Sequence, residues 1–183
     1  MTTGADIQII IHGCLENDRK AQEELYRRFF PSMMPVCMRY VRDRDDALEL
    51  LNDAFLKVFK HLAAYDVSKA LFYTWMKKIV INTAIDRLRK QDPAGEYEML
   101  SDQLEGPGIE NEAISKMNGD ELLNLIRQLP VTTRLVFNLY SIDGYSHKEI
   151  ASMLGISEGT SRWHLSDARR QLKLIIHFME TIT

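Results

Sequence analysis

The chain has 183 residues with a formal net charge of −3, and 45% of them are hydrophobic, so it can form one or two globular domains with modest cores. Two cysteines without CxxC spacing argue against a disulfide framework or a zinc site, and no apolar stretch approaches the roughly 20 residues that span a bilayer. The start, MTTGADIQII, lacks the basic and apolar regions of a signal peptide, so we expect a soluble, cytoplasmic protein.

Helical patterns dominate the region before residue 91. Asp18 can cap a first helix that carries Leu25 on its apolar side. Pro31 and Pro35 are expected to interrupt this helix, because a proline inside a helix removes a backbone hydrogen bond, and a helical pattern resumes over 36–41.

Residues 45–62 predict an amphipathic helix with two distinct sides. Apolar residues recur on one side at helical spacing: Ala47, Leu50, Leu51, Ala54, Phe55, Val58, Phe59 and Leu62. Another side, called the acidic face below, gathers Asp45, Glu49, Asn52 and Asp53. From the residues alone, the acidic face is either a solvated surface, as most charge clusters are, or a docking surface.

Residues 72–90 combine aromatic and basic side chains. Phe72, Tyr73 and Trp75 come first, and a predicted helix follows with five cations: Lys77, Lys78, Arg87, Arg89 and Lys90. Rings beside a basic helix suit unstacked bases, because the rings can take the base faces and the cations the phosphates. The competing interpretation places the rings in the core, where aromatic side chains usually lie, and leaves the cations solvated.

Residues 91–121 hold nine acids and one base, which leaves 22 bases against 17 acids in the rest of the chain. The stretch also contains two prolines and several glycines and shows little periodicity, so it predicts a flexible acidic linker between two domains. Further helices are expected over 112–128 and from Pro130 to Tyr140, with a turn at Gly144.

Residues 146–172, SHKEIASMLGISEGTSRWHLSDARRQL, predict two helices joined by a tight glycine turn. Ser146 and Glu149 fit a capping box, Gly155 fits a left-handed helix end, and Ser157 can cap the second helix. One side of that second helix is apolar, and the other carries Arg162, Trp163, His164, Arg169 and Arg170. This is the helix-turn-helix pattern of major-groove readers, although an ordinary helical hairpin with solvated charges has the same spacing.

Signatures of catalysis are missing from the sequence. Phosphate-loop, nucleophile-turn and HExxH motifs do not occur, and the five histidines lack ligand spacing. We therefore expect no enzyme activity, catalytic residue, metal or cofactor.

Several stretches together resemble the extracytoplasmic-function (ECF) sigma factors, the smallest members of the sigma-70 family of promoter-recognition subunits. They are RKAQEELYRRF, DDALELLNDAFLKVFKHL, YDVSKALFYTWMKKIVINTAIDRLRK and LPVTTRLVFNLYSIDGYSHKEIASMLGISEGTSRWHLSDARRQL, in the family's order. The resemblance implies an all-α protein with an N-terminal domain over 1–92, an acidic linker over 93–115 and a C-terminal helix-turn-helix domain over 116–183. It also implies two partners, core bacterial RNA polymerase and promoter DNA, and is compatible with an anti-sigma factor as a third partner.

The resemblance assigns roles to three sets of residues. The acidic face of Asp45, Glu49, Asn52 and Asp53 would bind core polymerase. The −10 element would be opened and its extruded bases held around Phe72, Tyr73, Trp75, Lys78, Asn82, Asp86, Arg87 and Arg89. In this set Asn82 can pair with a base edge, and Arg87 and Arg89 can anchor phosphates. The −35 element would be read by Ser157, Glu158, Gly159, Thr160, Arg162, Trp163, His164 and Arg169.

The C-terminal match departs from the family at two positions. Ser161 stands where the family commonly has a branched apolar residue, so looser packing is expected there. Trp163 replaces a small polar residue, and it can either contact DNA or pack on a neighbouring helix. Two rival functions remain, a helix-turn-helix regulator with a sensory N-terminal domain and a helical adaptor that binds only protein. The first leaves residues 45–62 and 72–90 unexplained, and the second leaves the basic recognition face unexplained.

Overall fold

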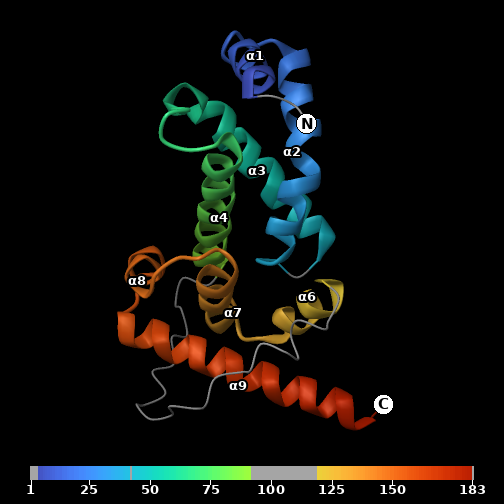
Figure 1. The fold of residues 1–183 in the computed structure, drawn as a ribbon, viewed down its shortest axis with the longest axis vertical. Coiled ribbons are helices and arrows are strands. Elements are labelled where there is room, and N and C mark those ends of the chain that lie inside the picture. Colours follow the sequence, from blue (N-terminus) through green and yellow to red (C-terminus); the bar gives the residue numbers. More distant parts are fainter. Residues whose placement is uncertain (1–3, 42, 92–118, 183) are drawn as a thin grey trace. The chain divides into compact units, whose positions relative to one another are not determined.

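The computed structural model describes residues 4–41, 43–91 and 119–182, and it divides into two compact units, Met1–Pro93 and Ala94–Thr183 (Figure 1). Helices joined by turns make up the described residues, with no strand among them. The predicted all-α fold with two helical domains is therefore confirmed. The predicted linker, residues 93–115, lies outside the described residues.

Two further findings concern only the described part of the chain. None of its helices is long and apolar enough to cross a membrane. Its His, Cys, Asp and Glu side chains form no group of three or more that could hold a metal ion.

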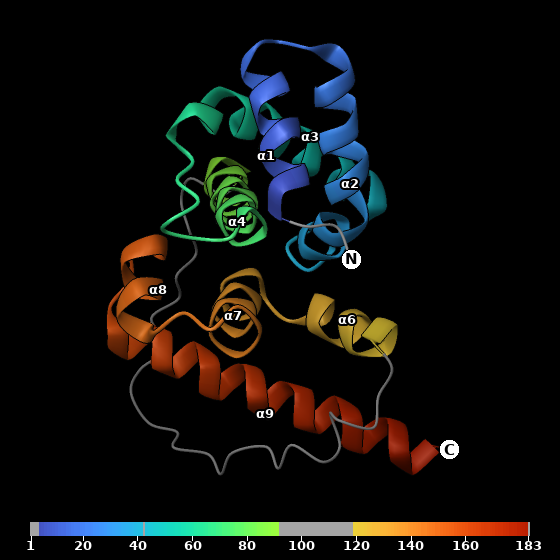
Figure 2. The same cartoon turned by 45° about the horizontal axis from the view of Figure 1, so that its top comes forward.

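The N-terminal unit is built on three mutually packed helices. They are α2 (Arg19–Met38), α3 (Arg44–His61) and α4 (Phe72–Gln91), and α1 (Gly4–Leu15) packs on α2 (Figure 2). Asp18 caps α2, and Asp43 caps α3 by accepting a 2.8 Å hydrogen bond from the Asp46 backbone N–H. The unit's core contains side chains from all three central helices: Leu25, Met33, Cys37, Leu50, Leu51, Val58, Met76 and Ile81.

The expected interruption at Pro31 and Pro35 is wrong, because α2 runs through both prolines. A proline inside a helix costs about 3 kcal/mol through the lost hydrogen bond and ring clash. Tertiary burial offsets this cost, because Met33, Met34, Val36 and Cys37 around Pro35 are all buried.

The C-terminal unit is organised around one long helix, α9 (Glu158–Ile182). Lying along one side of α9 are α6 (Gly119–Gln128), α7 (Val131–Phe137) and α8 (His147–Leu154) (Figure 2). A π-helical turn, Asn138–Ile142, extends α7. The core between these helices contains Leu125, Ile126, Val136, Leu139, Ile150, Leu154, Leu165, Ala168 and Leu172.

The helix-turn-helix is confirmed in its local details. Ser146 and Glu149 form the predicted capping box at the start of α8. Gly155 ends α8 at a φ of 71°, in the left-handed region that favours glycine. The Ser157 hydroxyl accepts a 2.9 Å hydrogen bond from the Thr160 backbone N–H and so caps α9.

Candidate nucleic-acid interface

All four residues of the acidic face on α3 are exposed. Asp45, Glu49, Asn52 and Asp53 all lie at the surface, because Ala47, Leu50, Leu51 and Ala54 turn the opposite side of α3 into the core. The Tyr26 hydroxyl of α2 donates a 3.0 Å hydrogen bond to Asn52 Oδ1 and so borders the face.

Ion pairs join α3 to the basic helix α4. Arg87 Nη2 lies 2.7 Å from Glu49 Oε2 and 3.0 Å from Asp46 Oδ1. Lys57 Nζ lies 3.0 Å from Asp86 Oδ2. Arg87, which we expect at a phosphate, is therefore bound to α3 carboxylates in the free protein. These pairs connect residues 29 to 41 positions apart, so helical periodicity gave no signal for them.

The aromatic cluster at the start of α4 divides into buried and exposed rings. Phe72 is only 4% exposed, and its ring centroid lies 5.0 Å from Phe29 and 5.1 Å from Tyr65. This burial favours the interpretation of Phe72 as a core side chain over the expectation that its ring holds an extruded base. Tyr73 is 41% exposed, and Trp75 is half-buried.

The polar residues of the predicted −10 set line up on the outer side of α4. Lys78, Asn82, Asp86 and Arg89 are all exposed. They recur at spacings of three or four residues, so they share one side of the helix. Trp75 lies on this same side, whereas Tyr73 lies about half a turn away around the start of the helix. The side therefore offers an aromatic ring, an amide group and cations, which is the chemistry that single-stranded bases and phosphates need.

The start of α9 presents the remaining polar residues of the recognition helix. Ser157, Glu158 and Gly159 are exposed, and Thr160 is half-buried beneath them. Because the first turn of a helix has unpaired backbone N–H groups, it can hold a phosphate. Arg162 projects from the next turn with 64% of its side chain exposed, and its Nη2 lies 3.0 Å from Glu158 Oε2.

The expectation that His164 lies on the exposed face is wrong. It is 6% exposed, and its Nδ1 shares a 3.0 Å hydrogen bond with Thr133 Oγ1 of α7. Burial lowers the pKa of His164, and the nearby Asp167 opposes this shift. Trp163 is half-buried, with its ring centroid 4.9 Å from that of His164. His164 lies one residue before Leu165 on the helix stripe that faces the core, so its position indicated burial although its residue type did not.

Ser161 does not loosen the packing, contrary to expectation. It is 0% exposed, and its hydroxyl shares a 2.9 Å hydrogen bond with His147 Nδ1 at the start of α8. The His147 ring stacks on Tyr140, with centroids 4.5 Å apart and an interplanar angle of 21°. Burial is the main cause that lowers the pKa of His147, and the positive charge of Arg162 adds to it. No local pattern in the sequence singles out His147 or Tyr140.

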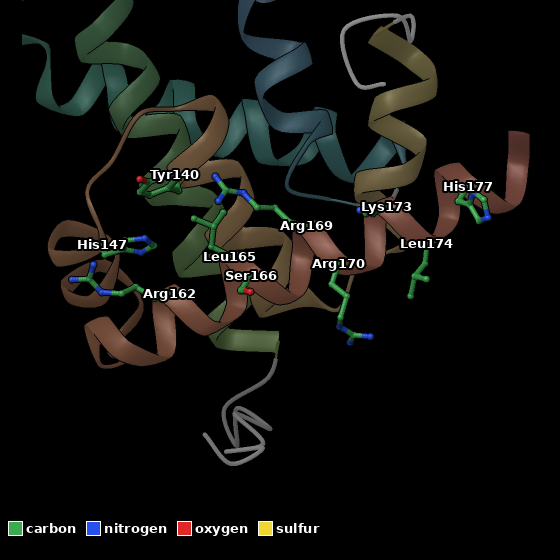
Figure 3. A pocket seen from close by; sticks show the side chains of 10 residues that line it. All are labelled: Tyr140, His147, Arg162, Leu165, Ser166, Arg169, Arg170, Lys173, Leu174 and His177. Carbon is green, nitrogen blue, oxygen red and sulfur yellow. The ribbon is translucent and has the colours of Figure 1, made fainter. Parts of the chain in front are cut away.

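A groove with a volume of about 730 Å³ runs along α9 within this unit (Figure 3). Tyr140, His147 and Arg162 lie together at one end of it, and Lys173 and His177 lie towards the other. Arg169 and Arg170 line the middle, beside the apolar side chains of Leu165 and Leu174. The positive charge along the groove suits a polyanion better than a neutral ligand.

Comparison with known proteins identifies both units. The model of sigma-70 region 2 matches residues 25–93, and the model of sigma-70 region 4 matches residues 119–172. The ECF RNA polymerase sigma-E factor of Escherichia coli K12 is 27% identical over 176 residues, covering 90% of this chain and 91% of its own. The ECF RNA polymerase sigma factor SigM of Mycobacterium tuberculosis is 27% identical over 166 residues, covering 90% of this chain and 81% of its own.

A solved structure shares the fold. It is the sigma factor RpoE of Bartonella quintana in complex with the anti-sigma factor NepR, with a TM-score of 0.54 and 17% sequence identity. The match covers 85% of this chain and 96% of that one.

Proposed function

The chain belongs to the ECF sigma factors of the sigma-70 family, and from this premise we propose how its residues divide the work of transcription initiation. It is a non-catalytic subunit that binds core RNA polymerase in the cytoplasm and directs it to promoters. The observation that carries this function is the match of region 2 to the N-terminal unit and of region 4 to the C-terminal unit. Membership rules out the two rival functions, a sensory regulator and a protein-only adaptor.

The acidic face of α3 is the proposed polymerase-docking surface. Its four side chains are exposed while the opposite side of α3 is buried, so a partner can reach them without disturbing the core. Carboxylates there would attract a basic surface of the polymerase and steer association.

The exposed side of α4 is the proposed site that holds the opened −10 strand. Trp75 would stack on a base from this side and Tyr73 from the start of the helix, Asn82 would pair with a base edge, and Lys78 and Arg89 would meet phosphates. Phe72 supports this surface from the core instead of touching DNA, since its ring packs on Phe29, Tyr65 and Trp75.

Arg87 can contact a DNA phosphate only if it first separates from the carboxylates of Glu49 and Asp46. Both pairs are partly exposed, so each contributes little stability and can be exchanged for a phosphate. Polymerase cations that approach Glu49 would compete with Arg87 for it. Docking would therefore favour the release of Arg87 towards the DNA.

The start of α9 is the proposed reader of the −35 element. The exposed N–H groups around Ser157, Glu158 and Gly159 would hold a phosphate, and Arg162 would exchange its surface pair with Glu158 for a base edge. Arg169 lines the groove on the same helix and would add a phosphate contact. His164 has no direct part in this revised set.

Reconstitution with core RNA polymerase tests the assignment of the two units. We expect the full chain to co-elute with core enzyme and to compete with a labelled sigma factor for it. A chain that carries Arg162→Ala should still co-elute, because the recognition helix lies outside the docking unit. Loss of core binding in this variant would contradict the assignment of polymerase docking to the N-terminal unit and of −35 reading to the C-terminal unit. An anti-sigma partner stays a prediction, and the NepR complex is a property of the Bartonella protein.

A further inference from the structure

Two hydroxyl–imidazole pairs tie the recognition helix to the helices beneath it. Ser161 on α9 shares a 2.9 Å hydrogen bond with His147 on α8. His164, three residues later on α9, shares a 3.0 Å hydrogen bond with Thr133 on α7. The two pairs are reciprocal, because α9 supplies the hydroxyl in one and the imidazole in the other.

Burial makes both pairs costly to break. Ser161, Thr133 and His164 are 0%, 2% and 6% exposed, so water cannot readily replace a lost partner. His147 is additionally held by its stack on Tyr140, which fixes the plane of its ring. Each hydrogen bond therefore limits how far α9 can rotate or slide, because a hydrogen bond needs a defined distance and angle and apolar contacts do not.

The two pairs hold α9 at Ser161 and at His164, which flank Arg162 in the sequence. Ser161 and His164 project from the buried side of α9, and Arg162 projects outwards between them (Figure 3 shows Arg162 beside His147). A side chain extends roughly 5–6 Å from the helix axis, so a rotation of about 20° moves its end by roughly 2 Å. A bidentate contact to a base edge does not survive such a shift, because its hydrogen bonds span only about 2.7–3.2 Å.

We propose that Thr133, His147, Ser161 and His164 are positioning residues for promoter discrimination, and that their two hydrogen bonds set the rotation of α9 and thereby the base pair that Arg162 contacts. This inference rests on the proposed function, since it needs Arg162 to read the −35 element. These four residues would act through their hydrogen bonds to one another, without needing a contact with DNA.

The experiment measures base preference and not only binding. Holoenzyme is assembled with each full-length variant and used to select from a promoter pool with a randomised −35 element, and the enrichment of each base is read by sequencing. Arg162→Ala defines the base pair that Arg162 reads. Thr133→Val removes one hydroxyl with nearly unchanged shape, and Ser161→Ala removes the other. Thr133→Ser retains the hydroxyl, and Ile150→Val is a control that trims the same core without touching either pair.

We expect Thr133→Val and Ser161→Ala to lower the preference at the base pair defined by Arg162→Ala at least about fivefold. Thr133→Ser and Ile150→Val should leave that preference within about twofold, even where the thermal midpoint falls. If Arg162→Ala changes no base preference, the proposed reading by Arg162 fails. If Arg162→Ala does change it while Thr133→Val and Ser161→Ala behave like Ile150→Val, the residues serve stability alone and the positioning role is refuted.

Discussion

Reversing two charges on the acidic face, Glu49→Lys with Asp53→Lys, should weaken polymerase binding without unfolding the chain. Glu49 is 70% exposed on its side chain and pairs with Arg87 at 2.7 Å. An exposed pair of this kind contributes at most about 1 kcal/mol, and Arg87 keeps its second partner, Asp46, at 3.0 Å. Against a typical unfolding free energy of about 5–15 kcal/mol, the fold should persist.

The loss of binding should be larger than the loss of stability. Two unit charges about 4 Å apart attract by about 1 kcal/mol in water and more near a protein surface, so two lost attractions amount to about 2 kcal/mol. This corresponds to a roughly 30-fold weaker affinity, before any repulsion from the new lysines. The assay is a titration of labelled chain with core polymerase at low and high salt, and the deficit should shrink as salt screens the charges.

A matched control separates docking from overall charge. Glu16→Lys with Glu24→Lys changes the net charge by the same amount at two exposed positions, one in the turn after α1 and one on α2. Glu24 lies about 200° around α2 from Tyr26, the residue that contacts α3, so it points away from the acidic face. Docking through the acidic face is refuted if this control loses as much affinity as the α3 variant, or if the α3 variant binds core polymerase like the parent.

Three further predictions follow from the described side chains and the linker sequence. Phe72→Ala should lower the unfolding free energy by about 3–5 kcal/mol, whereas Tyr73→Ala should change it little but slow promoter opening; equal effects on stability would contradict the assignment. Because burial lowers the pKa of His164 in the folded state, the unfolded chain binds the proton more readily, and stability should fall as the pH drops below about 6.5. His164→Gln should flatten this pH dependence in calorimetry, and an unchanged slope would refute it. Removing about ten residues from the linker, 93–115, should abolish promoter use but not core binding, because a linker too short to span both elements loses avidity; normal transcription from the shortened chain would contradict it.

Local pattern explains why the helix-turn-helix was predictable in detail. The capping box at Ser146 and the left-handed Gly155 depend on residues within a few positions of each other, and both occur as expected. The amphipathic α3 is predictable for the same reason, because its 3.6-residue period separates the buried side from the acidic face.

The features that sequence reasoning missed depend on tertiary contacts. The hydrogen bond of His164 joins it to Thr133, 31 residues earlier, and that of Arg87 joins it to Glu49, 38 residues earlier. Residue type also misled, since a histidine on a helix with arginines suggested an exposed base reader. For Phe72 the residue type left two interpretations open, because an aromatic ring next to a basic helix can contact DNA or lie in the core. Its packing on Phe29 and Tyr65 places the ring in the core.

The function as a promoter-specific initiation factor is tested most directly by transcription from genomic DNA in vitro. Core polymerase with and without the chain is supplied with fragmented genomic DNA, and the 5′ ends of the transcripts are sequenced. We predict discrete start sites that depend on the chain and share two upstream motifs at a fixed spacing. Arg162→Ala should relax the motif farther from the start sites and leave the nearer one unchanged. Start sites that are the same with core polymerase alone would contradict the account.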